Sequence, residues 1–319
     1  MGTKLRNLIE PKLVDKQKLK NAKVAIDGTN FLIKYLSIIK RQGKILFGET
    51  GEPISHVFGF GYLVVNLLEA KMRPIVSLDG VPDEKKRLVN QHIQQKMTMF
   101  WRIYDGNAHI MKEELYRNKY FLFDKIKSDL RVFLSLLGVP CVIAPSEAEA
   151  QASNLVKMGV ADVVFSEDYD CLLYGATRWI REFHVSDKKV QLINLRDVLK
   201  DLGISYVQLV DLALLVGTDI FPGINGIGPK KGIHLIKKYG FFEEVAQALQ
   251  VELPDNLDQL RGYYLNPPKL TYKPLFGYPN FLMLEEYLRD KMNPIRRDKF
   301  LKRLKKAIKE FRMTQKTLC

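Results

Sequence analysis

Four short apolar runs, separated by helical patterns, constrain the fold of this chain more than any other feature. The runs are rich in valine and isoleucine and cover residues 23–26, 74–78, 140–143 and 162–165. Continuous runs of this length are typical of strands that are buried on both faces of a parallel sheet. The helical patterns cover residues 31–40, 56–71, 118–137 and 147–158. We therefore expect an α/β fold with a mostly parallel central sheet and helices on both faces.

The remaining segments are less regular. Residues 82–117 are polar and basic, and we interpret them as a helical cap, although a solvated charged insertion would have the same composition. From Tyr206 onward the patterns are helical, except for a loop-rich stretch at 253–279. A last helix should begin at Asn293-Pro294, because asparagine is a good N-cap and proline suits the first helical position. Its apolar residues follow helical spacing and should pack on the body; they are Phe300, Leu301, Leu304, Ile308 and Phe311.

The chain is strongly basic. Its 50 lysine and arginine residues outnumber its 36 acids, which gives a net charge of +14. This charge favours a polyanionic partner, either a nucleic acid or an anionic membrane surface, although a basic protein need not have one. No stretch approaches the roughly 18–20 apolar residues of a membrane span, so we expect no membrane insertion. Three scattered cysteines and five scattered histidines argue against disulfides and a zinc site.

Acidic residues lie where the predicted strands end. They are Asp27, Asp79, Glu147, Glu149, Asp168 and Asp170, and a seventh, Asp219, lies in a later Gly-Thr-Asp turn. Because the carboxyl ends of parallel strands meet at one edge of a sheet, the first six should converge there. Each acid alone also has a simpler explanation as a helix cap or a turn residue.

Such a cluster needs neutralising charge. Two carboxylates ~4 Å apart repel each other by about 4 kcal/mol at an effective dielectric of 20. A pair of Mg²⁺ ions is the simplest neutraliser, because this hard cation prefers oxygen ligands. Two such ions suit phosphodiester hydrolysis. The chain has neither a Gly-x-Ser-x-Gly elbow nor a Gly-x-x-x-x-Gly-Lys-Ser/Thr loop to suggest another chemistry.

A glycine-rich turn precedes one of the later helices. Residues 222–231 read PGINGIGPKK. Glycine allows close backbone approach, and a helix N-terminus offers free N–H groups next to the charges of Lys230 and Lys231. This pattern suits phosphate binding without sequence preference, although a plain helix-to-helix turn would also explain the glycines.

Together these motifs resemble the flap endonuclease family, the structure-specific 5′ nucleases of DNA replication and repair. The segments that carry the resemblance are 26–30, 77–80, 144–151, 166–175, 216–219 and 223–230. The resemblance implies a PIN-like 5′ nuclease fold with a helix–two-turn–helix motif at the glycine turn. It implies that all seven acids serve two Mg²⁺ ions, for which Mn²⁺ can substitute, and that Lys86 orients the scissile phosphate. It also implies a K⁺ ion at the glycine turn.

The resemblance divides the chain into six expected segments. They are nuclease parts at 1–81 and 118–205, a gateway and cap at 82–117, a helix–two-turn–helix region at 206–250, a helical region at 251–313, and a tail at 314–319 that is similar to the start of a sliding-clamp motif. The implied DNA contacts are Lys40, Arg41, Lys86, Glu147, Asp219, Gly226, Gly228, Lys230 and Lys231.

Three positions depart from the family pattern. Ile33 replaces a tyrosine that stacks on a base, Leu63 replaces a DNA-facing arginine, and Ile93 replaces a gateway arginine. Loss of a guanidinium fork weakens charge stabilisation on a phosphate, so we expect an altered rate or flap preference.

The leading hypothesis is a Mg²⁺-dependent 5′ flap endonuclease with 5′ exonuclease activity. We expect it to be a monomer that acts on branched DNA with a 5′ flap, inside the cell with the chromosomal DNA, in an archaeal cytoplasm or a eukaryotic nucleus. Two alternatives stay open: a weak or inactive junction-binding protein on the same fold, and a sister nuclease that prefers bubbles or Holliday junctions.

Overall fold

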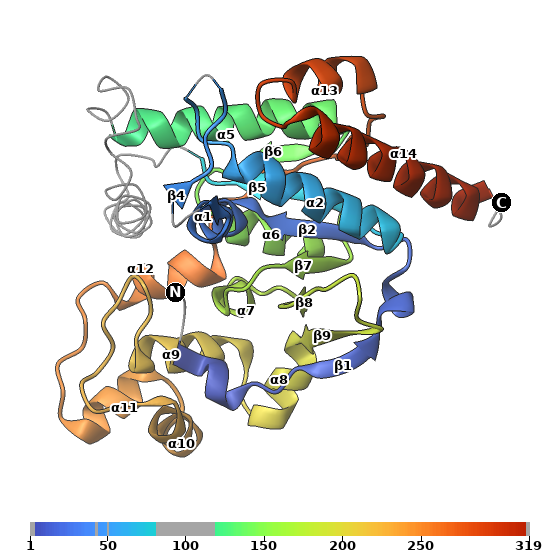
Figure 1. Cartoon of the computed structure of the whole chain (residues 1–319). Coiled ribbons are helices and arrows are strands. Elements are labelled where there is room, and N and C mark those ends of the chain that lie inside the picture. Colours follow the sequence, from blue (N-terminus) through green and yellow to red (C-terminus); the bar gives the residue numbers. More distant parts are fainter. Residues whose placement is uncertain (1–3, 42–43, 50, 81–118, 317–319) are drawn as a thin grey trace.

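The computed structural model describes residues 4–41, 44–49, 51–80 and 119–316 (Figure 1). The expected cap at 82–117, with Lys86 and Ile93, lies outside the described residues. So do residues 317–319 of the expected tail.

A seven-stranded sheet forms the centre of the fold, with the strand order β1-β9-β8-β7-β2-β5-β6. The strands are β1 (Lys12–Asp15), β2 (Lys23–Asp27), β5 (Arg73–Leu78), β6 (Cys141–Ile143), β7 (Val163–Phe165), β8 (Arg178–Ile180) and β9 (Lys189–Asn194). The four predicted runs are β2, β5, β6 and β7, and these strands pair in parallel. The prediction of a mostly parallel sheet is therefore confirmed.

Three strands of the seven-stranded sheet were not predicted. β8 pairs in parallel with β7, and β9 then pairs antiparallel with both β8 and β1. Only Val190 and Ile193 of β9 are buried, and the polar Gln191 interrupts the strand, so it has no continuous apolar run. A short hairpin, β3 (Lys40–Arg41) with β4 (Lys44–Ile45), follows the first long helix. Two 3₁₀ turns, η1 (Lys4–Leu8) and η2 (Lys16–Leu19), flank β1.

Helices cover both faces of the sheet, as predicted (Figure 1). One face carries α1 (Gly28–Ile38), α2 (Ser55–Glu69), α5 (Lys119–Leu136), α13 (Phe281–Tyr287) and α14 (Pro294–Lys316). The other face carries α6 (Ala148–Lys157), α7 (Asp170–Leu173), α8 (Leu195–Leu202) and α9 (Tyr206–Val216). Alternation along β2 supplies both cores, because Val24 and Ile26 join the first and Ala25 joins the second.

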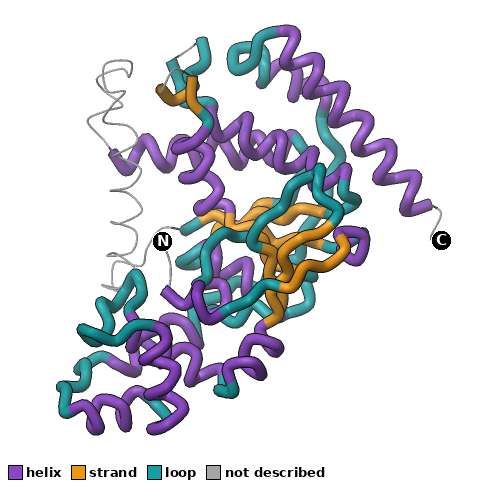
Figure 2. The backbone as a smooth tube through the Cα atoms, turned by 60° about the horizontal axis from the view of Figure 1, so that its bottom comes forward, coloured by secondary structure: helices purple, strands orange, loops and turns teal. Residues whose placement is uncertain are grey.

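A helical group extends the second face at one end of the sheet (Figure 2). It contains α9, α10 (Pro229–Tyr239), α11 (Phe242–Leu249) and α12 (Leu257–Leu265). The stretch at 253–279 was expected to be loop-rich, and α12 corrects that expectation for nine of its residues. Leu257, Leu260 and Tyr264 place one buried face of α12 on this core, and the Asn-Pro-Pro sequence at 266–268 follows its end.

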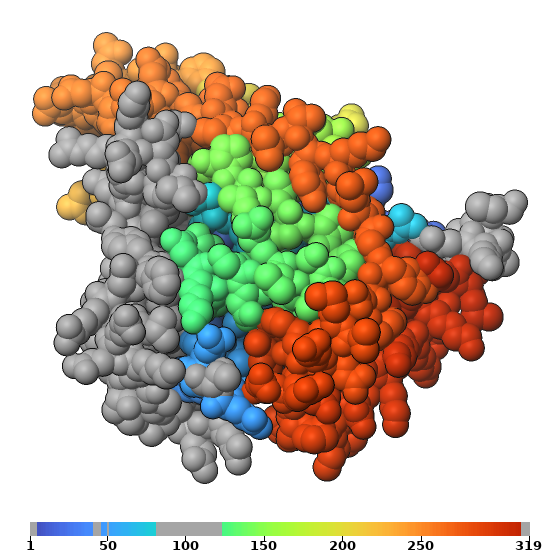
Figure 3. All heavy atoms as spheres, turned by 90° about the horizontal axis from the view of Figure 1, so that it is seen from above, coloured from blue at the N-terminus to red at the C-terminus, as the bar shows by residue number. Residues whose placement is uncertain are grey.

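The last helix begins where the sequence predicted. The side chain of Asn293 accepts a hydrogen bond from the backbone N of Arg296 at 2.9 Å. Phe300 and Leu304 are buried, and α14 packs against α2, which confirms that the apolar stripe faces the body. Seen from above, the C-terminal segments lie beside α5 (Figure 3). The helix continues to Lys316, so residues 314–316 of the expected tail are helical. No described helix is both long and apolar enough to cross a bilayer.

Candidate active site at the carboxyl edge of the sheet

The parallel strands bring six predicted acids to one edge of the sheet. Asp27 is the last residue of β2, in register with Ser77 of β5, and Asp79 comes directly after β5. Glu147 and Glu149 follow β6 at the start of α6, and Asp168 and Asp170 follow β7 at the start of α7. Because these four strands run in the same direction, the topology places all six side chains at the same end.

All six side chains are buried, and their residues are only 1–6% exposed. They are Asp27, Asp79, Glu147, Glu149, Asp168 and Asp170. Burial of a carboxylate is unfavourable unless hydrogen bonds or cations compensate it. Hydrogen bonds or cations must therefore offset the negative charge at this edge.

One chain of hydrogen bonds links β2 to the segment after β7. Ser166 Oγ donates to Asp27 Oδ2 at 2.9 Å, and the backbone N of Asp168 donates to Ser166 Oγ at 3.1 Å. The backbone N of Asp170 donates to Asp168 Oδ1 at 3.1 Å. Asp27 also accepts from the backbone N of Asn30, so it caps α1 as well. Asp27 therefore caps a helix and also lies at the acidic edge, whereas the simpler explanation for it was a turn.

Asp79 is fixed from the neighbouring elements. Its Oδ1 accepts from the backbone N of Ala148 at 2.7 Å, so Asp79 caps α6 from another strand. Glu147 occupies the N-cap position of α6 but makes no side-chain capping bond. The N-cap therefore lies one residue after Ser146, which would be the N-cap of a Ser146-x-x-Glu149 capping box. A Cβ on Gly80 would overlap the carbonyl oxygen of Ala144, which explains glycine after Asp79.

Neighbouring ionisable groups show how closely the acids gather. Burial raises the pKa of the Cys171 thiol, and the carboxylates of Glu149, Asp27 and Asp168 raise it further. Burial also raises the pKa of the Tyr264 phenol, to which Asp170 and Glu149 add. Glu149 therefore lies within electrostatic range of both Cys171 and Tyr264, and three of the other acids act on one or the other of these two residues. Asp219 is half-buried in the turn that follows α9.

The chemistry of this donor set fits Mg²⁺, because every candidate ligand is a carboxylate oxygen. Within the part of the chain that the structure describes, no three His, Cys, Asp or Glu side chains already form a cage for an ion. Two-ion binding by the acids consequently stays a prediction, supported by their convergence and burial.

Two of the positions that depart from the family pattern are buried in the core. Ile33 is 3% exposed and Leu63 is 6% exposed. Tyr35, two residues after Ile33, packs edge-on against Phe60, and a Cβ on Gly59 would overlap its ring. Ile33 also lines the cavity beside Asp168 that is described below.

The glycine turn connects α9 to α10. Gly217, Gly223 and Gly226 have φ angles of +106°, +80° and +75°, a region that favours glycine. A Cβ on Gly217 would lie 2.6 Å from the carbonyl oxygen of Pro222, so that glycine also allows the turn to close. By contrast, a Cβ on Gly226 or Gly228 would meet nothing within 4 Å.

Two lysines lie beside the open part of this turn. Lys230 and Lys231 are exposed in the first turn of α10, and Lys231 Nζ lies 3.5 Å from the carbonyl oxygen of Gly226.

Two further predicted DNA contacts belong to the β3–β4 hairpin. Lys40 is exposed on β3. The side chain of Arg41 lies outside the described residues.

Comparison with known proteins settles the family. Residues 138–219 match the XPG I-region family. The chain is 34% identical to flap endonuclease 1 of Methanocella arvoryzae, over all of this chain and 99% of the relative. The chain belongs to the flap endonuclease family. It is also 37% identical to flap endonuclease 1 of Methanothermobacter thermautotrophicus over 84% of each chain.

Solved structures agree with this assignment. The flap endonuclease-1 structure from Methanococcus jannaschii matches with a TM-score of 0.77 and 29% identity, over 97% of this chain and 99% of that one. The catalytic core of Rad2 in complex with DNA substrate matches with a TM-score of 0.72 and 22% identity, over 92% of this chain and 96% of that one. At 22% identity, the likeness to Rad2 shows a shared fold only.

The structure adds basic residues that the sequence motifs did not indicate. A cavity of about 480 Å³ lies beside Asp168, and Arg6, Lys34 and Arg181 contribute to its lining. Lys34 forms an ion pair with Glu167, and Arg181 lies over the ring of Tyr169 at 5.6 Å. These cations come from segments far apart in the chain, so no local pattern connects them.

Proposed function

We propose that this chain hydrolyses DNA at 5′ flaps, with two divalent ions held at the carboxyl edge of the sheet. Membership of the flap endonuclease family makes it a structure-specific nuclease. The observation that carries the proposal is the convergence of six buried carboxylates at the end of four parallel strands. Six carboxylates gathered at one edge repel each other, and bound cations would offset that repulsion.

The proposed ligands divide into two sets. Asp27, Asp79, Glu147 and Glu149 serve one ion, and Asp168, Asp170 and Asp219 serve the other. When bound, Mg²⁺ activates water and stabilises charge on the transferring phosphate. The hydrogen bonds of Asp27 and Asp79 to Ser166 and Ala148 hold these carboxylates in place before the ions arrive.

The proposed phosphate-handling groups are cationic side chains and free backbone groups. Lys86, outside the described residues, is proposed to orient the scissile phosphate. Gly226 and Gly228 leave open space over the backbone, which is what the close approach of a duplex phosphate or a K⁺ ion requires. Lys230 and Lys231 add charge there, and Lys40 and Arg41 add charge on the β3–β4 hairpin.

Flaps are preferred over bubbles and Holliday junctions as the proposed substrate. The support is that two full-length flap endonuclease comparisons reach 34% and 29% identity. By contrast, the human Holliday-junction complex in the comparison shares 19% with this chain. The proposed setting is the chromosomal DNA of the cell, where branched intermediates arise.

A substrate panel tests this proposal. The purified chain would be incubated in Mg²⁺ with end-labelled double-flap DNA, a bubble, a Holliday junction and a single strand. We expect incision close to the flap base and at least tenfold slower cleavage of the other substrates. Preferred cleavage of the bubble or the Holliday junction would support the sister-nuclease alternative. Tight flap binding without cleavage would support the junction-binding alternative.

A further inference from the structure

The residue Tyr263 connects α12 to the acidic edge. Its hydroxyl donates a hydrogen bond to Glu147 Oε1 at 3.2 Å. Glu147 is the N-cap residue of α6, and its side chain makes no capping bond within that helix. A donor from another part of the chain therefore helps to fix this carboxylate.

Two further tyrosines surround this contact. The ring centroid of Tyr263 lies 6.0 Å from that of Tyr174 and 5.1 Å from that of Tyr264. Tyr174 and Tyr264 are buried, at 2% and 0% exposure. The half-buried ring of Tyr263 packs against these two buried rings beside the acids, and this packing limits its freedom to move. The Tyr263 hydroxyl is therefore held at a defined position.

The segment that contains Tyr263 is attached to α6 at a second point. The side chain of Gln151 donates to the carbonyl oxygen of Leu270 at 2.8 Å and accepts from the backbone N of Leu270 at 2.9 Å. Gln151 is fully buried. Residues 263–270 thus hold the first turns of α6, which carry Glu147 and Glu149.

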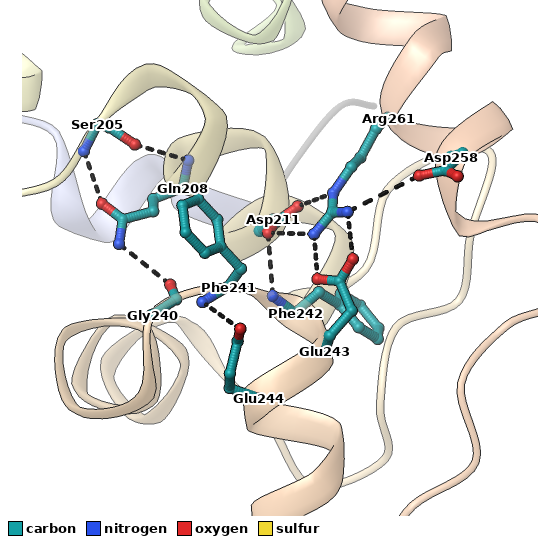
Figure 4. A network of polar contacts seen from close by, with 10 residues as sticks. All are labelled: Ser205, Gln208, Asp211, Gly240, Phe241, Phe242, Glu243, Glu244, Asp258 and Arg261. Carbon is teal, nitrogen blue, oxygen red and sulfur yellow. Dashed lines mark hydrogen bonds and ion pairs between the residues drawn. The ribbon is translucent and has the colours of Figure 1, made fainter.

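The helix that carries Tyr263, α12, is also attached to the helices around the glycine turn. Arg261, two residues before Tyr263, binds Asp211 of α9 and Glu243 of α11 (Figure 4). Asp211 is fully buried, so this attachment is not a loose surface pair. α12 therefore links α9, the helix that leads into the glycine turn, to the first turn of α6.

We propose that Tyr263 is a positioning residue, which orients Glu147 for a metal ion and makes α12 a mechanical link between the DNA-holding helices and the acidic edge. This inference rests on the proposed function, because it takes Glu147 as a metal ligand. Groups that hydrogen-bond a ligating carboxylate set its orientation, and their loss weakens metal binding by about 10–100-fold.

Mn²⁺ titration of Tyr263→Phe by isothermal calorimetry, without DNA, tests the inference. The variant removes one hydroxyl and keeps the ring that packs against Tyr174 and Tyr264. We expect about tenfold weaker Mn²⁺ binding, with flap binding in EDTA and the urea unfolding midpoint unchanged. In cleavage assays, the rate lost at low Mg²⁺ should return at high Mg²⁺, with the KM for DNA unchanged. Tyr278→Phe, an exposed tyrosine on the loop before α13, is the matched control and should show none of these effects.

Mn²⁺ affinity within twofold of the parent chain would overturn the inference. So would a clear fall in the urea unfolding midpoint of Tyr263→Phe, because the hydroxyl would then be a structural group. Failure of the proposed function gives a different result, in which the parent chain binds Mn²⁺ but cuts no flap. The calorimetric comparison still decides the role of Tyr263 in that case.

Discussion

Arg261 holds the buried carboxylate of Asp211 with two hydrogen bonds. The Nε–Oδ1 distance is 2.6 Å and the Nη2–Oδ2 distance is 2.7 Å (Figure 4). Asp211 Oδ2 also accepts from the backbone N of Phe242 at 2.9 Å, at the start of α11. The hydrogen bonds to Asp211 and Glu243 raise the pKa of Arg261 above its ordinary value. This pair fixes three helices around the glycine turn.

Removal of Arg261 should therefore destabilise the chain. Arg261→Ala leaves Asp211 charged and buried, and we expect a loss of about 3–5 kcal/mol in the free energy of unfolding. Urea unfolding followed by circular dichroism measures it. Arg303→Ala is the control, because Arg303 makes a similar bidentate pair with Glu69 in a more exposed place, where about 1 kcal/mol is expected. Equal losses of unfolding free energy in the two variants would contradict the expectation that the buried Arg261–Asp211 pair stabilises the fold more than the exposed Arg303–Glu69 pair.

The contact between His56 and Asp129 should make stability sensitive to acid. Burial acts to raise the pKa of Asp129, but the hydrogen bond and charge of His56, with the Tyr287 hydroxyl, outweigh it and lower the pKa below its ordinary 3.8. A carboxyl with a lowered pKa stabilises the fold above pH 3.8, and this contribution disappears as the pH falls through the lower folded value.

Acid unfolding of Asp129→Asn checks this effect. Below pH 3.8 the variant should lose less unfolding free energy per pH unit than the parent chain, although it is less stable at neutral pH. Asp124→Asn, an exposed acid on the same helix, should follow the parent curve. Parallel curves for the parent chain and Asp129→Asn would show that Asp129 does not contribute to the pH dependence of stability.

Gly228 should matter for DNA and little for folding. Its φ is −94°, and a Cβ would meet nothing within 4 Å, so Gly228→Ala should lower the unfolding free energy by at most ~1 kcal/mol. The added methyl group would stand where a phosphate approaches the backbone, and we expect about tenfold weaker duplex binding. Gly262→Ala, in the interior of α12, should stabilise the chain by about 0.5–1 kcal/mol and leave DNA binding unchanged. Unchanged DNA binding by Gly228→Ala would contradict the proposal that DNA approaches the backbone of this turn.

Lys230 should contribute to DNA binding through its positive charge, without sequence preference. Lys230→Ala should weaken binding to all duplex sequences equally and should reduce the slope of log K against log salt by about 1. Fluorescence anisotropy at several salt concentrations measures the slope. Lys306→Ala, a mostly exposed lysine on α14, serves as the control and should keep the parent slope. A parent slope in Lys230→Ala would mean that Lys230 contacts no phosphate.

Local sequence patterns predicted the elements that carry the acids, because buried parallel strands have continuous apolar runs and end in polar residues. The same patterns missed β1 and its neighbour β9 on one side of the sheet, because partly exposed strands have no such runs. They also missed α12, because its buried residues Leu257, Leu260 and Tyr264 lie between polar residues and an Asn-Pro-Pro sequence. Tyr263 and Arg181 could not be found in this way, since their roles depend on contacts between segments that lie far apart in the chain.

The most direct test of the central claim is single-turnover cleavage of end-labelled double-flap DNA by the parent chain and by Asp170→Asn. This variant keeps the shape of the side chain and removes a buried charge at the carboxyl edge. Asp197→Asn, an exposed acid paired with Lys12, is the matched control. We predict rapid Mg²⁺-dependent cleavage by the parent chain and by Asp197→Asn, and at least 100-fold slower cleavage by Asp170→Asn and in EDTA. Cleavage by Asp170→Asn at the parent rate, or by the parent chain in EDTA, would contradict metal-dependent hydrolysis at this edge.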